Sequence, residues 1–287
     1  MPDTPTIQLG HSPDPDDAFM FYAMAQNPPL IDLKGHRFQH TLQDIQTLNQ
    51  RAMRGELEVS AISIHAFPYV ADKYALMSCG SSMGDGYGPM VVTRAPMTID
   101  DLRGKRIAIP GKLTTAYLTL QLCLGRGGEA FDYEVVMFDA IPAAVQSGEF
   151  DAGLLIHEGQ LTYKKLGLHL VVDLGVWWKE QTGLPLPLGG NVVRKDLGET
   201  ACQEITDVIR ESIQYSLDNR AQAVKYALQF GRDLNHELAD EFVGMYVNHW
   251  TLDYGQRGRE AITRLLADGA QRGFVPAISE LQFVTAK

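Results

Sequence analysis

One proline- and glycine-rich run divides this chain: Gly183-Leu184-Pro185-Leu186-Pro187-Leu188-Gly189-Gly190. Proline and glycine interrupt helices and favour extended or turning chain, so we interpret the run as a crossing between two structural units. We expect an earlier crossing near Pro96, which follows the strand-like residues 90–93. The residues between the crossings, 95–188, would then form an inserted unit.

Outside this run, short apolar stretches alternate with helical patterns. We predict strands at residues 6–10, 59–63, 90–93, 106–109, 134–138, 152–156 and 191–193, and helices at 17–25, 141–147, from Thr114 and throughout most of the chain after Glu199. This alternation is typical of α/β proteins. We expect a large discontinuous lobe (1–94 and 189–287), a small inserted lobe (95–188) and a ligand cleft between the two lobes.

Composition excludes several classes of protein. The 287 residues include 35 acidic and 25 basic side chains, a formal net charge of −10, which argues against general nucleic-acid binding. No apolar run reaches the length of a membrane span, and the N-terminus lacks the basic and apolar regions of a secretory signal. The three cysteines show no metal or disulfide spacing. We therefore expect a cytoplasmic protein that does not act on membranes, and we make no prediction of its oligomeric state.

The loop at residues 111–117 (GKLTTAY) follows a predicted strand and opens a helix. A helix start offers unpaired N–H groups and a partial positive charge, which suit an anion, and the hydroxyls of Thr114 and Thr115 could add donors. A simple capped helix is the alternative interpretation. The spacing matches neither a nucleotide-binding P-loop nor a dinucleotide fingerprint.

His157 directly follows the apolar run at residues 152–156. At the carboxyl end of a buried strand its imidazole would project into a ligand crevice, where it could act as a general base. A purely local hydrogen-bonding role is the alternative. His11 and His65 also lie beside predicted strand ends, and either could line the cleft or face solvent.

Three aspartates, Asp14, Asp16 and Asp17, follow the first predicted strand. We favour helix capping and interaction with the helix dipole over cation binding, because the further ligands of a calcium loop are missing. No zinc-binding or serine-hydrolase motif occurs, so we expect neither a metal nor a cofactor. Trp177 and Trp178 could stack on a planar ligand or simply form part of the core.

Several of these segments resemble a known family. Residues 10–22 (GHSPDPDDAFMFY) are similar to the opening signature of the menaquinone-biosynthesis family of the futalosine route; residues 42–49, 86–92, 110–117, 153–158 and 172–189 are also similar. The resemblance implies a type II periplasmic-binding-protein fold, in which two α/β lobes are joined by two crossing strands. It also implies a carbon–carbon lyase that converts cyclic dehypoxanthine futalosine to 1,4-dihydroxy-6-naphthoate and a three-carbon product.

The resemblance further implies roles for individual residues. His157 matches the family's catalytic base, and Thr114 and Thr115 match its substrate-binding threonines. Ser63 lies in the substrate-binding segment together with Ala61 and Ile62. The presence of a histidine at position 157 favours the naphthoate-synthase branch over the related chorismate dehydratase, and the implied partner is a small anionic aromatic substrate.

The chain departs from this pattern at two places. Residues 16–18 are Asp-Asp-Ala where the synthases usually carry Asn-Asp-Thr, and Ala61 stands where they usually carry lysine. These changes alter how an anionic substrate is held, and Lys112, Lys164 or Arg94 could replace the missing charge. Two other functions therefore stay open: a non-enzymatic solute-binding protein for a small anion, and a family enzyme acting on another aromatic carboxylate.

Overall fold

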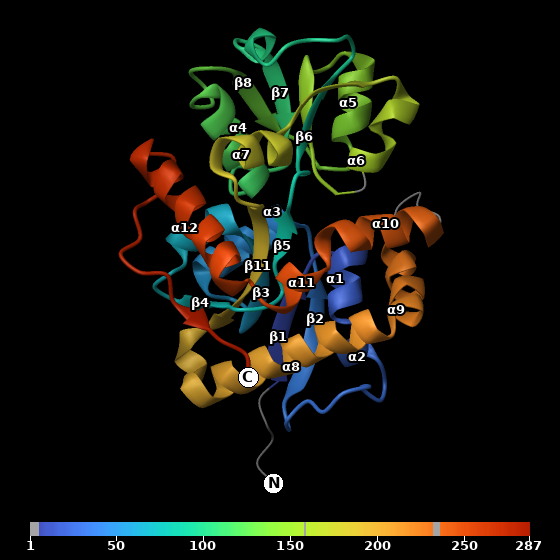
Figure 1. The fold of residues 1–287 in the computed structure, drawn as a ribbon, viewed down its shortest axis with the longest axis vertical. Helices are drawn as coiled ribbons and strands as arrows, with labels where there is room; N and C mark the ends of the chain where they lie inside the picture. Colours follow the sequence, from blue (N-terminus) through green and yellow to red (C-terminus); the bar gives the residue numbers. More distant parts are fainter. Residues whose placement is uncertain (1–5, 158, 232–235) are drawn as a thin grey trace.

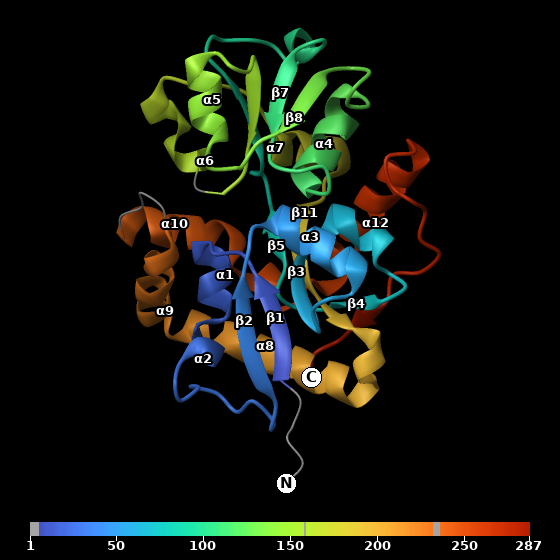
Figure 2. The same cartoon turned by 180° about the vertical axis from the view of Figure 1, so that it is seen from behind.

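The computed structural model describes residues 6–157, 159–231 and 236–287, and it shows two α/β lobes, each built on its own sheet (Figure 1). The view from behind shows the same division: β7 and β8 lie in one lobe, and β1 and β3 lie in the other (Figure 2). Among the described residues, no helix has both the length and the apolar character that a bilayer crossing requires.

The large-lobe sheet has the strand order β12-β4-β11-β3-β1-β2, with β5 paired to β11. Its strands are β1 (Thr6–His11), β2 (Arg37–Leu42), β3 (Val59–Ser63), β4 (Tyr74–Met77), β5 (Ser82–Gly84), β11 (Leu186–Arg194) and β12 (Phe283–Val284). β1 runs parallel to both β2 and β3. The carboxyl ends of these three strands therefore lie at one edge of the sheet.

The small-lobe sheet has the order β10-β6-β9-β7-β8. Its strands are β6 (Met90–Thr93), β7 (Arg106–Ile109), β8 (Asp132–Val135), β9 (Ala152–Leu155) and β10 (His169–Asp173). β7 runs parallel to β8 and β9, so these strands also end at a common edge. Open α/β sheets bind ligands outside the carboxyl ends of such parallel strands.

Helices cover both sheets. Those of the large lobe are α1 (Pro15–Met20), α2 (Tyr22–Ala25), α3 (Ile45–Arg54), α8 (Glu199–Asp218), α9 (Arg220–Ala227), α10 (His236–Tyr246), α11 (His249–Leu252) and α12 (Gly255–Gln271). Those of the small lobe are α4 (Thr115–Leu124), α5 (Ile141–Ser147), α6 (Gly159–Thr162) and α7 (Leu174–Thr182). Short 3-10 helices are η1 (Ile64–Tyr69), η2 (Asp100–Leu102), η3 (Tyr163–Leu166), η4 (Lys195–Leu197) and η5 (Leu228–Phe230).

Helix α4 belongs to two cores at once. Its Leu120 and Leu124 pack with the small-lobe strands, whereas Leu118 and Leu122 join a cluster that contains Leu265 of α12. Because this helix is apolar nearly all round, it must be buried on several faces. The two lobes are therefore packed together on the α12 side of the molecule.

Strand pairing shifts the lobe boundaries that we expected from sequence. β6 (Met90–Thr93) pairs with β9 and β10 in the small sheet, so residues 90–94 belong with the inserted lobe and not with the large one. The proline- and glycine-rich run enters β11 itself, which begins at Leu186. Proline and glycine suit this strand because its first part, at Leu186, pairs only with the short β5.

Three element predictions also need correction. The helix expected over 17–25 is divided into α1 and α2, with Phe21 between them. The strand expected at 134–138 is β8, which starts earlier and ends at Val135. Strand β2 falls in a segment for which we predicted no defined strand; its alternating, half-exposed pattern gives only a weak apolar signal.

Candidate functional site

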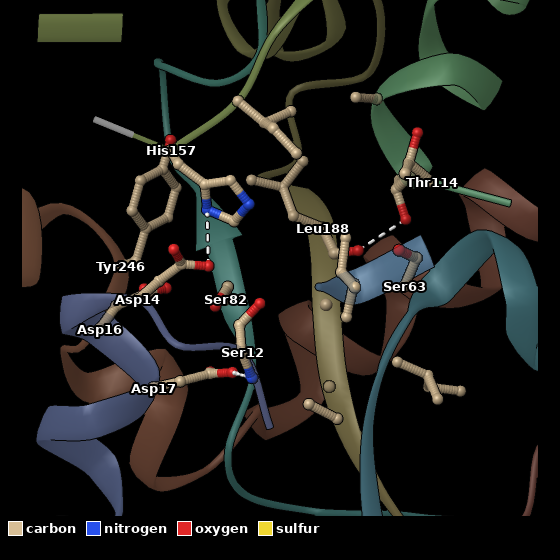
Figure 3. A pocket seen from close by; sticks show the side chains of 18 of the residues that line it. Ser12, Asp14, Asp16, Asp17, Ser63, Ser82, Thr114, His157, Leu188 and Tyr246 are labelled. Atoms are coloured by element: carbon tan, nitrogen blue, oxygen red, sulfur yellow. Dashed lines mark hydrogen bonds and ion pairs between the residues drawn. The ribbon is translucent and has the colours of Figure 1, made fainter. Parts of the chain in front are cut away.

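A pocket lies between the lobes, where the carboxyl ends of the parallel strands in both sheets face each other (Figure 3). It contains about 750 Å³ of atom-free space, its open mouth included. The residues that line it are Ser12, Asp14, Asp16, Asp17, Ile45, Ala61, Ile62, Ser63, Gly80, Ser82, Pro89, Thr114, Thr115, Ala116, Ile156, His157, Gln160, Leu188, Gly189, Gly190, Asn191, Phe242 and Tyr246.

All six site residues expected from sequence lie in this pocket. His157 reaches it from the segment after β9, Ser63 from the end of β3, and Thr114 and Thr115 from the start of α4. Ala61 and Ile62 form part of its wall. Residues that are far apart in the chain converge here because each follows or ends a strand at the facing sheet edges. Glu158, part of the quoted family motif, lies outside the described residues.

His157 has an unusual backbone and an available ring nitrogen. Its φ angle is +58°, a left-handed conformation that is uncommon for non-glycine residues and is often found at functional sites. The Nδ1 atom lies 3.3 Å from Asp14 Oδ2, and the ring packs edge-on against Phe138. Nε2 is buried and has no hydrogen-bond partner among the described residues. The Asp14 contact favours a proton on Nδ1, which leaves Nε2 as an acceptor toward the pocket.

The acidic cluster faces the pocket, which overturns our helix-capping interpretation for Asp14. Asp14 stands at the N-cap of α1, but its side chain makes no capping hydrogen bond and instead contacts His157. Asp17 accepts a hydrogen bond from the backbone N–H of Ser12 at 2.6 Å. The pKa of Asp17 is raised to about 7, chiefly by burial; the hydrogen bond from Ser12 opposes this shift, and the nearby Asp14 adds to it.

The two threonine hydroxyls are already engaged within the protein. Thr114 Oγ1 donates to the carbonyl of Gly111 at 2.8 Å and accepts from the backbone N–H of Tyr117. Thr115 Oγ1 donates to the carbonyl of Leu188 at 2.6 Å, joining the small lobe to β11. Neither hydroxyl has a hydrogen left for an anion. Both threonines therefore position the start of α4, whose first backbone N–H groups have no partner within the helix.

Ser63 differs from the threonines. Its Oγ accepts a hydrogen bond from Asn49 Nδ2 at 3.0 Å, and its backbone N–H donates to Asn49 Oδ1 at 2.8 Å. A hydroxyl that accepts one hydrogen bond still carries its own hydrogen as a donor. Ser63 and the first turn of α4 therefore present donors to the same side of the pocket, opposite Asp14 (Figure 3).

None of the lysines and arginines in the described ranges is among the residues that line the pocket. The candidates for the charge absent at Ala61 lie elsewhere: Lys112 stacks over the ring of Tyr133, Lys164 lies over Tyr163, and Arg94 lies beside Gly148. Ala61 itself packs with Leu48 and Leu57. The described pocket is therefore acidic on the α1 side and neutral on the α4 side.

Two further histidines are buried near the pocket but do not line it. His65 Nδ1 contacts the Thr114 carbonyl at 3.0 Å, and burial lowers its pKa to about 4. His11 Nε2 lies 3.1 Å from His40 Nδ1. Burial and the neighbouring ring lower the pKa of His11 to about 3, and burial lowers that of His40 to about 4. These neutral rings have structural roles, so the cleft position that we left open for His11 and His65 is not observed.

The tryptophans, too, lie outside the lining. Trp178 is buried and donates its indole N–H to the Pro185 carbonyl, and Trp177 packs against the apolar cores of both lobes. Their observed contacts are those of core residues, as in the second of the two roles that we considered, and neither ring faces the pocket to stack on a ligand. No described group of His, Cys, Asp and Glu side chains has an arrangement suited to a metal ion.

Sequence reasoning missed several pocket residues. Tyr246 of α10 donates to Gln160 Oε1 of the small lobe at 2.8 Å, and Asn191 of β11 is buried in the wall. Neither belongs to a motif, so only the fold reveals them. Asp14 could have been found by the argument used for His157, because it also follows a parallel strand that ends at the cleft.

Comparison with known proteins identifies the family of this chain. The sequence profile of a family described as menaquinone biosynthesis matches residues 7–271. The chain belongs to this family. The 1,4-dihydroxy-6-naphthoate synthase of Streptomyces coelicolor is 38% identical over 279 residues, covering 95% of this chain and 96% of that protein. The 1,4-dihydroxy-6-naphthoate synthase of Thermus thermophilus is 39% identical over 267 residues, covering 93% and 95%.

Solved structures agree on the fold. A crystal structure of an Archaeoglobus fulgidus protein has a TM-score of 0.88 at 43% identity and covers 94% of this chain and 98% of its own. The alkanesulfonate-binding protein SsuA of Xanthomonas axonopodis pv. citri has a TM-score of 0.71 at 12% identity, with 99% of each chain covered, a likeness of fold alone. The expected periplasmic-binding-protein fold is confirmed, and this member of the menaquinone-biosynthesis family is an enzyme of that pathway.

Proposed function

We propose that this enzyme is a 1,4-dihydroxy-6-naphthoate synthase, a carbon–carbon lyase that acts on cyclic dehypoxanthine futalosine. The observation that carries the proposal is the open Nε2 of His157, which lies buried in the inter-lobe pocket while Nδ1 contacts Asp14. This is the arrangement that a general base requires. The synthases that share 38–39% of the sequence are named for the product, 1,4-dihydroxy-6-naphthoate, and support this assignment.

The charge distribution of the pocket orients an anionic aromatic substrate. A substrate carboxylate is repelled by the Asp14 side and is attracted to the hydroxyl of Ser63 and the first backbone N–H groups of α4. Ile45, Ile62 and Leu188 line the space between these two sides and suit an aromatic ring. The hydroxyl-bearing part of the substrate then lies beside His157.

In this orientation, neutral His157 takes a proton at Nε2 from a hydroxyl or an activated carbon of the substrate. The carbon–carbon bond then breaks, the carbon that keeps its electron pair takes the proton back from the His157 imidazolium, and the aromatised naphthoate and a three-carbon fragment are released. Asp14 stabilises the imidazolium that forms. Closure of the lobes excludes water and aligns the base. The scheme uses groups of the chain itself and no cofactor or metal, and the biosynthetic relatives favour a cytoplasmic location.

Turnover of the purified protein tests the proposal. We expect cyclic dehypoxanthine futalosine to be converted to 1,4-dihydroxy-6-naphthoate, and His157→Ala to lower kcat by about 10²- to 10⁴-fold, the usual contribution of a general base. His169→Ala, an exposed histidine at the start of β10, is the matched control. Equal turnover by the two variants would show that His157 is not the base.

Calorimetry combined with product analysis distinguishes the proposed function from the two alternatives, a solute-binding protein and an enzyme acting on another aromatic carboxylate. Heat of binding without product would indicate a solute-binding protein, whereas turnover of a different aromatic carboxylate would indicate another reaction of the family. Chorismate and a set of aromatic acids serve as the comparison ligands. The proposed function requires that the cyclic futalosine derivative be both bound and consumed.

A further inference from the structure

Asp16 is a buried carboxyl group that the proposed mechanism does not use. It lies in the first turn of α1, is 8% exposed, and lines the pocket together with Asp14 and Asp17, which are 0% and 8% exposed (Figure 3). Three carboxyl groups thus share one wall of the pocket. Like charges at such spacing cannot all be ionised without a large cost.

The three carboxyl groups differ in their partners. Asp14 contacts His157, and Asp17 accepts from the Ser12 N–H. Oδ1 of Asp16 is buried and has no hydrogen-bond partner in the part of the chain that the structure describes. The amide of Asn191, which is 1% exposed and lines the same pocket, also has both polar atoms without a described partner. Buried polar groups normally find partners, so these polar atoms in the pocket are available to a ligand.

The elements packed against α1 leave the charge of Asp16 uncompensated. From α10, Tyr246 faces Asp16, but its hydroxyl donates to Gln160. From α9, Arg220 stacks over Phe19 and pairs with Asp240. Burial raises the pKa of Asp16 well above its ordinary value, and the neighbouring Asp17 and Asp14 act in the same direction, while the backbone N–H groups of Asp16 and Asp17 oppose the shift.

α8 packs apolar side chains against α1, and the hydrogen bond described between them comes from the uncharged Ser212, which donates to the Met20 carbonyl. His157 is the basic group at this wall, and its described ion-pair contact is with Asp14. A second and third carboxylate beside that pair would have no positive charge to oppose them. Retention of a proton by one carboxyl group removes this repulsion.

We infer that Asp16 keeps its proton at neutral pH and donates a hydrogen bond from Oδ1 to an oxygen of the bound ligand. A protonated carboxyl offers one O–H donor, and the described pocket wall supplies no acceptor to Oδ1. The ligand atom must therefore be an acceptor, a carbonyl, hydroxyl or ether oxygen. The identity of the ligand rests on the proposed function, in which this oxygen belongs to the hydroxyl-bearing part of the substrate beside His157.

Infrared spectroscopy of the protein without substrate tests the protonation directly. We expect a carboxylic-acid C=O band at pH 7 in the wild type that Asp16→Asn removes. Asparagine is neutral like the protonated acid, so it leaves the surroundings of Asp17 unchanged. Asp132→Asn, the same change at an exposed carboxylate of β8, should leave the band in place. A wild-type spectrum without a band that depends on Asp16 overturns the inference.

Binding of cyclic dehypoxanthine futalosine tests the hydrogen bond. Asp16→Ala should weaken binding at least about tenfold, since a buried ligand oxygen loses its donor, and Asp16→Asn should recover most of that loss through its amide donor. Wild-type affinity should fall as the pH rises past the ionisation of Asp16, and Asp16→Asn should abolish this dependence on Asp16. Equal losses in the two variants overturn the inference. Failure of the proposed function is distinguishable, because the wild type would then form no product while the infrared band persists.

Discussion

Asp14 Oδ2 of the large lobe lies 3.3 Å from His157 Nδ1 of the small lobe, so one ionisable pair joins the two sheets across the pocket. Asp14 is fully buried, whereas the His157 side chain is 15% exposed. The contact is longer than a charge-assisted hydrogen bond of about 2.7–2.9 Å. Catalytic hydrogen bonds often tighten only when substrate is bound. In the proposed mechanism, closure of the lobes would shorten this contact and orient His157 as the base.

Replacing Asp14 by asparagine should lower kcat by roughly tenfold to a hundredfold and change KM little. The imidazolium formed during turnover then faces a neutral amide oxygen in place of a carboxylate; a hydrogen bond to a charged group is worth about 1.5–3 kcal/mol, and the loss falls on the step that charges the ring. Steady-state kinetics measure the effect. Asp85→Asn, which removes an exposed ion pair with Lys179, is the control. An unchanged kcat for Asp14→Asn would show that the pair is incidental.

Replacing Ser63 by alanine should raise KM by about tenfold and leave kcat less affected. The variant loses one hydroxyl donor to the substrate carboxylate, and hydrogen bonds to charged groups contribute about 1.5–3 kcal/mol. The matched control is Ser60→Ala on the same strand, because Ser60 is buried but donates to the Ala61 carbonyl and does not line the pocket. If the two alanine variants have the same KM, Ser63 does not hold the substrate.

The free energy of unfolding should fall in acid, because His65 is buried as a neutral ring. Burial lowers its pKa from 6.5 to about 4, so between these values the unfolded chain takes up a proton that the folded protein does not. The stabilisation is complete above pH 6.5 and is lost as the pH falls toward 4, by up to about 3 kcal/mol for one group. His65→Asn retains a side-chain N–H for the Thr114 carbonyl and should flatten this dependence.

Urea unfolding of the wild type and His65→Asn between pH 6.5 and 4 measures the contribution of His65. His11 and His40 contribute with the same sign, and Asp17, whose pKa is raised, contributes with the opposite sign. The difference between the two proteins isolates His65 from these groups. His169→Asn at an exposed position controls for the substitution. Parallel stability curves for the wild type and His65→Asn would contradict the prediction.

Local pattern was sufficient for much of the fold. The predicted strands at residues 59–63, 90–93 and 106–109 match β3, β6 and β7, because short apolar runs between turn signals are buried strands wherever they occur. The lobe boundary at residue 94 was misplaced. β6 forms hydrogen bonds with β9 and β10, and such pairing depends on segments that lie far apart in the chain.

The sequence by itself determined the α/β alternation, the family signature and the chemistry available at His157 and Ser63, since these depend on residue types and their local order. Tertiary structure alone decided which hydrogen-bond donors of the pocket are available to a ligand. The hydroxyls of Thr114 and Thr115 donate to the carbonyls of Gly111 and Leu188, respectively. Tertiary structure also turned the acidic cluster from an expected helix cap into a pocket wall. Hydrogen-bond partners and burial arise between segments distant in the chain, and no local pattern records them.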